Sequence, residues 1–248
     1  MTLDERLLAR GFSLASITED GETKLALKDL EDEAVMPLTV DFTSPALVHR
    51  LKHGLSKNQP LGRALGLKSM DPELAPFVFD ATAGLGTDAL IIAALGCRVR
   101  SLERSDVIFA LLKDGKQRLL AKACEDDELK KIADRMSFEH GDARAILAAI
   151  ANGSAPAIDH TKPDVVYLDP MYPDDGRANS ALPKKTMQMF RRLLDGDEDA
   201  SELWEAAMSA ALKRVVVKRP MKAPPLGSQK PSHSFEGKTA RFDLYLVP

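Results

Sequence analysis

The stretch FVFDATAGLGTDALIIAAL, residues 77–95, predicts the fold of this chain. Its first four residues read as an apolar strand that ends on Asp80, and residues 87–95 read as a helix stopped by Gly96. Between them, Gly84 and Gly86 permit a tight turn and let a ligand approach the backbone and the free N–H groups at the helix start. We therefore expect a strand–turn–helix unit that binds a small molecule.

The same strand–helix pattern continues toward the C-terminus. Further strands are predicted at 97–103, 136–140, 165–169 and 214–218, with helices at 106–123, 143–151, 184–194 and 202–213. Alternating units of this kind form a parallel sheet with helices on both faces, and a closing hairpin (232–236 and 240–247) adds an antiparallel strand. The predicted fold class is thus α/β, Rossmann-like, with a mostly parallel seven-stranded sheet whose ligands bind at the carboxyl ends of the strands.

The first 70 residues have a different pattern and predict a small α/β extension in front of the domain formed by residues 71–248. Helices are expected at 3–10, 45–54 and 61–67, and strands at 23–27 and 38–42. Residues 42–70 contain five basic side chains and no acidic one, although the net charge of the chain is −3. A continuous acid-free run predicts a lobe that grips a polyanion, against the alternative of an ordinary solvated surface.

Composition excludes several other classes of protein. The two cysteines, Cys97 and Cys124, lack the spacing of metal ligands or of a disulfide framework, so we expect no metal. We also expect a cytoplasmic protein with no membrane association, because no leader peptide and no apolar run long enough to span a bilayer is present.

Carboxylates at the strand ends indicate which ligand the glycine turn binds. Glu103 ends the second strand and can accept hydrogen bonds from ribose hydroxyls, and Asp142 after the third strand is placed to contact an adenine. Gly84, Gly86 and Ala89 fit the G-x-G-x-x-A pattern of a dinucleotide site, which would bind NAD. The acid at Asp80 instead favours S-adenosylmethionine, because a pyrophosphate gains nothing from a neighbouring carboxylate.

A second motif, DVVYLDPMYP at residues 164–173, supplies the chemistry. The carboxylate of Asp169 and the carbonyl of Pro170 can accept hydrogen bonds from the exocyclic amine of a planar base. These bonds favour a localised lone pair on a poor nucleophile and stabilise the positive charge that develops during methyl transfer. Tyr172 offers a stacking surface worth about 1–3 kcal/mol per base. The motif therefore predicts methylation of a base amine.

Basic side chains near this rim predict contacts with nucleic-acid phosphates. Lys218 and Arg219 close the fifth strand, and Arg50 and Lys52 lie in the acid-free run. The alternative for each is a solvated position on the surface.

The motifs DATAGLGTDAL, GCRVRSLERS, VVYLDPMYP, RVVVKRP, APPL and RFDLY, in this order and spacing, closely resemble the small-subunit ribosomal RNA methyltransferase J family. The resemblance runs from about residue 40 to the C-terminus. It implies a class I methyltransferase that uses S-adenosylmethionine to methylate N2 of one guanine, guanosine 1516, in 16S rRNA or the 30S subunit. The family contacts its cofactor at positions that correspond here to Thr87, Asp88, Glu103, Arg104, Asp142, Ala143 and Asp169.

Two positions depart from the family pattern. Arg commonly stands where this chain has Thr87, and small hydroxyl residues stand where it has Asp142 and Ala143. Three other functions compete with this interpretation: an NAD-dependent oxidoreductase, a non-catalytic RNA-binding or ribosome assembly factor, and a DNA amino-methyltransferase.

Overall fold

The structure is a computed structural model that describes residues 2–19, 21–69, 74–154, 162–171, 184–194 and 199–248. Its main element is a seven-stranded sheet with the strand order β5-β4-β3-β6-β7-β9-β8. The strands are β3 (Phe77–Asp80), β4 (Arg98–Glu103), β5 (Met136–His140), β6 (Val165–Leu168), β7 (Arg214–Pro220), β8 (His233–Glu236) and β9 (Ala240–Leu246). The pairs from β5 to β7 are parallel, and β9 runs antiparallel to both of its neighbours. The predicted fold class is confirmed.

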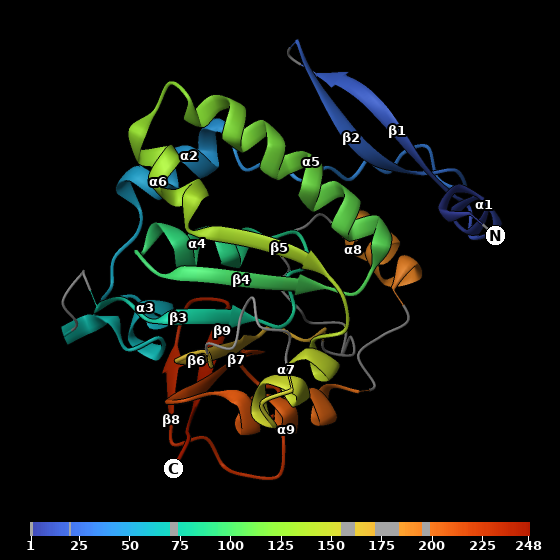
Figure 1. Ribbon diagram of the computed structural model, residues 1–248. Helices are drawn as coiled ribbons and strands as arrows, with labels where there is room; N and C mark the ends of the chain where they lie inside the picture. The colour runs from blue at the N-terminus through green and yellow to red at the C-terminus, as the bar shows by residue number, and fades with distance from the viewer. Residues whose placement is uncertain (1, 20, 70–73, 155–161, 172–183, 195–198) are drawn as a thin grey trace.

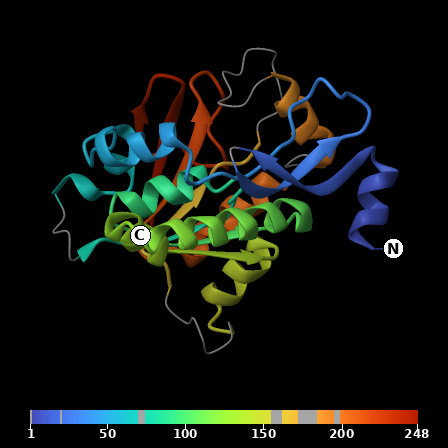
Figure 2. The same cartoon turned by 90° about the horizontal axis from the view of Figure 1, so that it is seen from above.

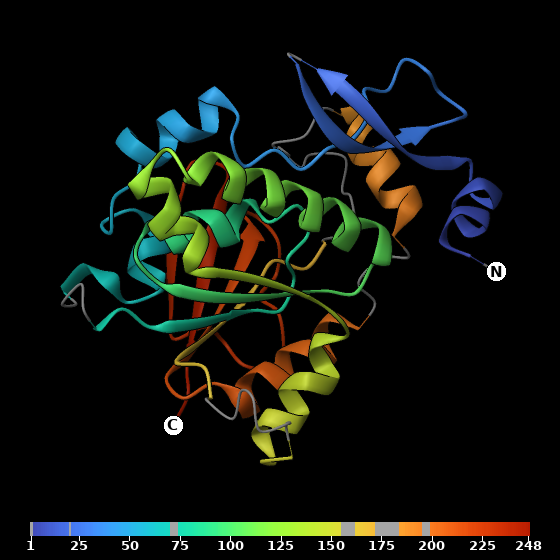
Figure 3. The ribbon, with the colours of Figure 1, turned by 45° about the horizontal axis from the view of Figure 1, so that its top comes forward.

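Helices cover the two faces of this sheet (Figures 1 and 2). The helices on one face are α4 (Thr87–Ala94), α5 (Asp106–Ala123) and α6 (Asp127–Asp134), and those on the other are α7 (Ala143–Ala151) and α9 (Ala200–Ala210). A further helix, α8 (Lys184–Leu193), lies beside the N-terminal part of the chain in Figure 3.

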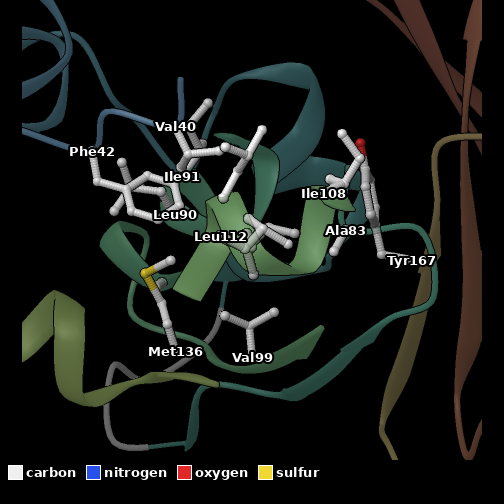
Figure 4. Close-up of a cluster of buried hydrophobic side chains, with 14 of the residues drawn as sticks. Val40, Phe42, Ala83, Leu90, Ile91, Val99, Ile108, Leu112, Met136 and Tyr167 are labelled. Atoms are coloured by element: carbon white, nitrogen blue, oxygen red, sulfur yellow. The ribbon is translucent and has the colours of Figure 1, made fainter. Parts of the chain in front are cut away.

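Alternation along the strands separates the two hydrophobic cores. Val165 and Tyr167 of β6 pack in the core beneath α4 and α5, whereas Val166 and Leu168 pack against α7 and α9. Successive side chains of a strand point to opposite faces, so a strand buried on both sides has apolar side chains in both cores. Figure 4 shows the first core, in which Leu90 and Ile91 of α4 lie near Leu112 of α5.

The N-terminal part contains α1 (Leu3–Ala9), a hairpin of β1 (Phe12–Glu19) and β2 (Glu22–Asp29), the helices α2 (Pro45–His53) and α3 (Pro60–Ala64), and a short 3-10 turn at Leu67–Ser69. β2 packs on α5, and Phe12, Leu27 and Phe42 are buried in the same core cluster as Val78 of β3. In Figure 3 the hairpin lies over α8, where the Arg192 Nη1 atom is 2.8 Å from Asp29 Oδ2.

Three local predictions differ from the structure. The strand β1 was not expected, and residues 38–42 do not form the predicted strand, since Leu38 makes only an isolated bridge with Leu27. The helix α6 was also missed. Its acidic start caps it, because the Asp126 side chain accepts hydrogen bonds from the backbone N–H groups of residues 128 and 129.

The described helices include no candidate membrane span. Within the described ranges, no helix combines the length and the apolarity that crossing a bilayer requires.

Candidate functional site

The candidate site lies where β3, β4, β6 and β7 end, on the face of the sheet that α4 covers. Asp80 ends β3, Glu103 ends β4, and Asp169 directly follows β6. Lys218 lies two residues before the end of β7. Asp80 pairs in register with Tyr167 of β6. Residues in register across a parallel sheet share a face, so strand geometry brings these side chains together from segments far apart in the sequence.

The glycine turn between β3 and α4 uses its two glycines differently. Both have positive φ, 52° at Gly84 and 74° at Gly86. A Cβ atom built on Gly84 would meet, among the described residues, only the carbonyl oxygen of Thr82 at 3.9 Å. A Cβ on Gly86 would lie 2.8 Å from side-chain atoms of Leu112 and Phe42. Gly84 thus leaves the backbone open to a ligand, and Gly86 permits close packing on the core.

Glu103 holds this turn in place. Its carboxylate is buried and accepts hydrogen bonds from the backbone N–H of Gly84 at 2.9 Å and of Ser105 at 2.8 Å. Glu103 therefore orients the turn, and its contact with a ribose hydroxyl stays a prediction.

Asp80 is a buried acid next to the turn. Its pKa is raised to about 7, mainly by burial and also by the negative charges of Asp88 and Asp169, against the effect of a hydrogen bond from the Thr82 N–H. A cation bound near Asp80 would favour its ionised form. The position therefore suits the ammonium group of an amino-acid moiety better than a phosphate.

An ammonium group from β7 joins the two other acids of the site. Lys218 Nζ lies 2.8 Å from Asp88 Oδ2 and 2.8 Å from Asp169 Oδ2. The Tyr167 hydroxyl donates to the same Asp88 oxygen at 2.7 Å, and the Asp169 backbone N–H donates to Thr82 Oγ1 at 2.6 Å. Through Lys218, the start of α4 is thus joined to Asp169, the first residue of the DPMYP motif.

The third predicted group of cofactor residues lies at the start of α7. Asp142 caps this helix, accepting a hydrogen bond from the Arg144 N–H at 2.9 Å, and the Arg144 side chain lowers the pKa of Asp142. Ala143 is buried. Arg104, just after β4, pairs with Asp199 at 2.9 Å.

The remaining predicted residues occupy diverse positions. Thr87 is exposed at the first residue of α4, Pro170 is buried, and Tyr172 lies outside the described residues. Arg50 and Lys52 are exposed on α2, and Lys52 pairs with Asp126 at 2.8 Å.

Lys218 and Arg219 do not have the positions expected of phosphate ligands. Arg219 is 4% exposed, and its guanidinium donates two hydrogen bonds to the Pro224 carbonyl. Lys218 is partly exposed, and its ammonium group binds the two carboxylates of the site. Adjacent residues of a strand point to opposite faces, so only one of the two can face the site.

Sequence reasoning missed two groups that the structure brings into the site, Thr82 and Tyr167. The signal for Tyr167 was available, because a hydroxyl in a strand of otherwise apolar residues needs a buried partner. Thr82 had no such signal, since its role depends on how the turn meets the residue after β6.

A pocket of about 560 Å³ adjoins the end of β4. It is bounded by α1, by residues 104–107 and by the end of α8, and three arginines line it, Arg6, Arg10 and Arg104. No cluster of three or more His, Cys, Asp or Glu side chains suited to a metal ion occurs in the described part of the chain.

The features of the glycine turn fit S-adenosylmethionine. Gly84 leaves room beside the backbone, Glu103 supplies an acceptor for a ribose, and Asp80 and Asp88 supply negative charge for a cationic ligand. The dinucleotide alternative would place a pyrophosphate beside these same acids.

Comparisons with known proteins agree with this fit. Residues 10–247 match the family described as "Putative SAM-dependent methyltransferase". Two relatives named ribosomal RNA small subunit methyltransferase J come from Thioalkalivibrio sulfidiphilus and Pseudoalteromonas atlantica. The first is 46% identical over 90% of this chain and 81% of the relative, and the second is 46% identical over 91% and 83%.

A solved structure is similar to the whole fold. The SAM-dependent methyltransferase of Neisseria gonorrhoeae is 33% identical and superposes with a TM-score of 0.63, over 90% of this chain and 79% of that protein.

Proposed function

Because the chain belongs to the ribosomal RNA small subunit methyltransferase J family of SAM-dependent methyltransferases, we propose that it methylates the exocyclic N2 of a guanine in 16S rRNA, at guanosine 1516. The observation that carries the proposal is the position of Asp169. Its carboxylate follows β6 at the rim of the sheet and is joined through Lys218 to Asp88, at the start of the helix that follows the glycine turn.

Bound S-adenosylmethionine supplies an electrophilic methyl group on a sulfonium. We propose that Asp80, Gly84, Gly86, Thr87, Asp88, Glu103, Arg104, Asp142, Ala143 and Asp169 form its site. Glu103 would bind the ribose hydroxyls, and the acids near the turn would bind the cationic amino-acid moiety.

The acceptor half of the site activates the target amine by hydrogen bonding. Methyl transfer is a displacement in line, so positioning of the nucleophile matters more than proton transfer to it. The Asp169 carboxylate and the Pro170 carbonyl would accept the two amine N–H groups, and Tyr172 would stack on the base. An amine held in this way keeps a localised lone pair, and its developing positive charge faces a carboxylate.

The RNA itself would be held by basic side chains away from the target base. Arg50 and Lys52 on the exposed surface of α2 are the proposed contacts, and residues 1–70 are the proposed RNA-gripping lobe. Arg219 is a weaker candidate than its sequence position indicated, because its guanidinium is buried. A 16S rRNA substrate also implies that the enzyme works in the cytoplasm.

The proposal is tested by offering tritiated S-adenosylmethionine with 30S subunits, naked 16S rRNA and DNA. We expect label in N2-methylguanosine of 16S rRNA, identified by nucleoside mass spectrometry. Label only in DNA would refute the ribosomal substrate, and tight binding of NAD with no binding of S-adenosylhomocysteine would refute the cofactor.

Asp169→Ala separates the enzyme from a non-catalytic assembly factor. We expect loss of methylation with a smaller decrease in affinity for S-adenosylhomocysteine, measured by calorimetry. An Asp169→Ala protein that methylates the RNA normally would contradict the proposed role of this carboxylate.

The RNA contact is tested with Arg50→Gln and the matched control Lys213→Gln. Lys213 is exposed at the amino end of β7, remote from the carboxyl-end rim. Loss of one phosphate contact at Arg50 should weaken RNA binding and reduce the salt slope by about 1. Equal salt slopes for Arg50→Gln, Lys213→Gln and the unmodified protein would contradict the contact.

A further inference from the structure

The Lys218 side chain is built into the site by two short ion pairs. Its Nζ atom lies 2.8 Å from one oxygen of Asp88 and 2.8 Å from one oxygen of Asp169. The side chain is 29% exposed. Burial alone would lower the pKa of Lys218, but the two acids outweigh burial and raise the pKa above its ordinary value. The two acids thus favour the charged form of Lys218.

Acidic side chains surround Lys218. The site acids on this face of the sheet are Asp80 from β3, Asp88 from α4, Glu103 from β4 and Asp169 after β6, and the Tyr167 hydroxyl also faces Asp88. On β9, the residue paired with Lys218 is Phe242, which carries no charge. Lys218 pairs with both Asp88 and Asp169.

The distance between the carboxylates of Asp88 and Asp169 determines what the loss of the Lys218 charge would do to them. Both oxygens are 2.8 Å from the same nitrogen, so they are less than about 6 Å apart, a range at which like charges favour protonation of one carboxylate. A protonated Asp169 would present an O–H donor and fewer lone pairs. The amine of a base needs a strong acceptor there, so protonation would weaken the hydrogen bond on which the proposed reaction depends.

We propose that Lys218 is a positioning residue for methyl transfer, which holds the Asp169 carboxylate ionised and oriented for the target amine by tying it to Asp88 at the start of α4. This inference rests on the proposed function and replaces the phosphate contact expected from the sequence. It also links the two halves of the site, because Asp88 belongs to the cofactor helix and Asp169 to the base-binding motif.

The test is the pH profile of single-turnover methylation of 16S rRNA by the full-length protein. For Lys218→Met, we expect slow transfer at neutral pH and partial recovery at higher pH, with the acidic midpoint moved upward by about 1–3 pH units. Lys218→Arg keeps the charge and should keep the midpoint of the unmodified enzyme, although its larger head group lowers the rate.

Lys213→Met is the matched control. Lys213 directly precedes β7. Its Nζ pairs with Asp164 Oδ1 at 2.8 Å, so this ion pair has the same length as those of Lys218 but lies at the opposite end of the strand. Its loss should leave the midpoint unchanged. If Lys218→Met does not fold by circular dichroism, Lys218→Gln removes the charge, keeps hydrogen-bond donors, and carries the same pH test.

The outcomes separate this inference from the proposed function. If the unmodified enzyme methylates the RNA but Lys218→Met and Lys218→Gln lose activity equally at every pH, the positioning role is refuted and the proposed function stands. If the unmodified enzyme transfers no label to RNA, the proposed function is refuted and the inference with it. An upward midpoint shift in Lys218→Met, absent from Lys218→Arg and Lys213→Met, supports the inference.

Discussion

Gly86→Ala should destabilise the protein by about 2–5 kcal/mol through two effects that the structure separates. The first is the backbone, since φ is 74° and a non-glycine residue in the left-handed region costs about 1–2 kcal/mol. The second is packing. The new Cβ would lie 2.8 Å from Leu112 and Phe42, both almost fully buried, and 3.0 Å from Phe138. Overpacking of a core typically costs a further 1–3 kcal/mol, approximately.

A matched variant isolates the packing effect. Gly21, at the tip of the β1–β2 hairpin, has φ 77°, and a Cβ built there meets no described atom within 4 Å. Gly21→Ala should therefore cost only the backbone contribution, about 1–2 kcal/mol. Urea unfolding without cofactor, followed by the fluorescence of the single tryptophan, Trp204, measures both variants. Unfolding free energies of the two variants that agree within error would refute the argument from packing.

Gly84→Ala tests the other side of the same turn. Its Cβ would meet only the Thr82 carbonyl oxygen at 3.9 Å among described atoms, so the loss of stability should be as small as that of Gly21→Ala. A methyl group in the space proposed for the ligand should weaken binding of S-adenosylhomocysteine by about 10-fold or more, or 1.4 kcal/mol. Calorimetry that finds an unchanged dissociation constant would show that the ligand does not approach the turn at Gly84.

Two further substitutions test the support of the site and of the N-terminal part. Thr82→Val removes the acceptor of the Asp169 N–H and should lower both the turnover number and the stability, the latter by about 1–3 kcal/mol, whereas Thr82→Ser should retain both. Methylation assays and urea unfolding measure these effects, and a fully active Thr82→Val would contradict them. Burial opposes ionisation of Asp41, but hydrogen bonds from Lys24 and Thr43 lower its pKa to about 2. Because the folded pKa lies below the unfolded value, this stabilisation is complete above about pH 4 and is lost as the pH falls through 2. Asp41→Asn should therefore cost about 2 kcal/mol at pH 6 and little near pH 2, and unfolding curves with a pH-independent difference would contradict it.

Much of the main sheet could be predicted because its determinants are local. The strand at residues 77–80, the glycine turn and the helix that follows have apolar periodicity and breakers that act over a few residues. The hairpin strand β1 was missed because five of its eight residues are polar or alanine, and its position depends on pairing with β2. The strand predicted at residues 38–42 failed for the opposite reason, since its apolar residues Leu38, Val40 and Phe42 are buried by packing without forming a regular strand.

The residues of the candidate site also divide into those that could be predicted from the sequence and those that could not. Asp80, Glu103 and Asp169 could be chosen from sequence because each is a carboxylate at the end of an apolar strand, where ligands of a parallel sheet bind. The partners of these acids could not be chosen in this way. The sequence shows a lysine at position 218 but does not show whether it binds a phosphate in solvent or two carboxylates in the site. It also does not show that Arg219 beside it is buried.

The sequence by itself determined most strands and helices of the main sheet, the position of the glycine turn and the acids at the strand ends, because each depends on near neighbours in the chain. Tertiary structure alone decided which distant side chains meet. Asp169 and Lys218 are 49 positions apart in the chain, and Asp88 and Tyr167 are 79 positions apart. The physical reason is that the parity of a residue in its strand decides which face it occupies. Only the register between strands then decides which residues on that face are neighbours.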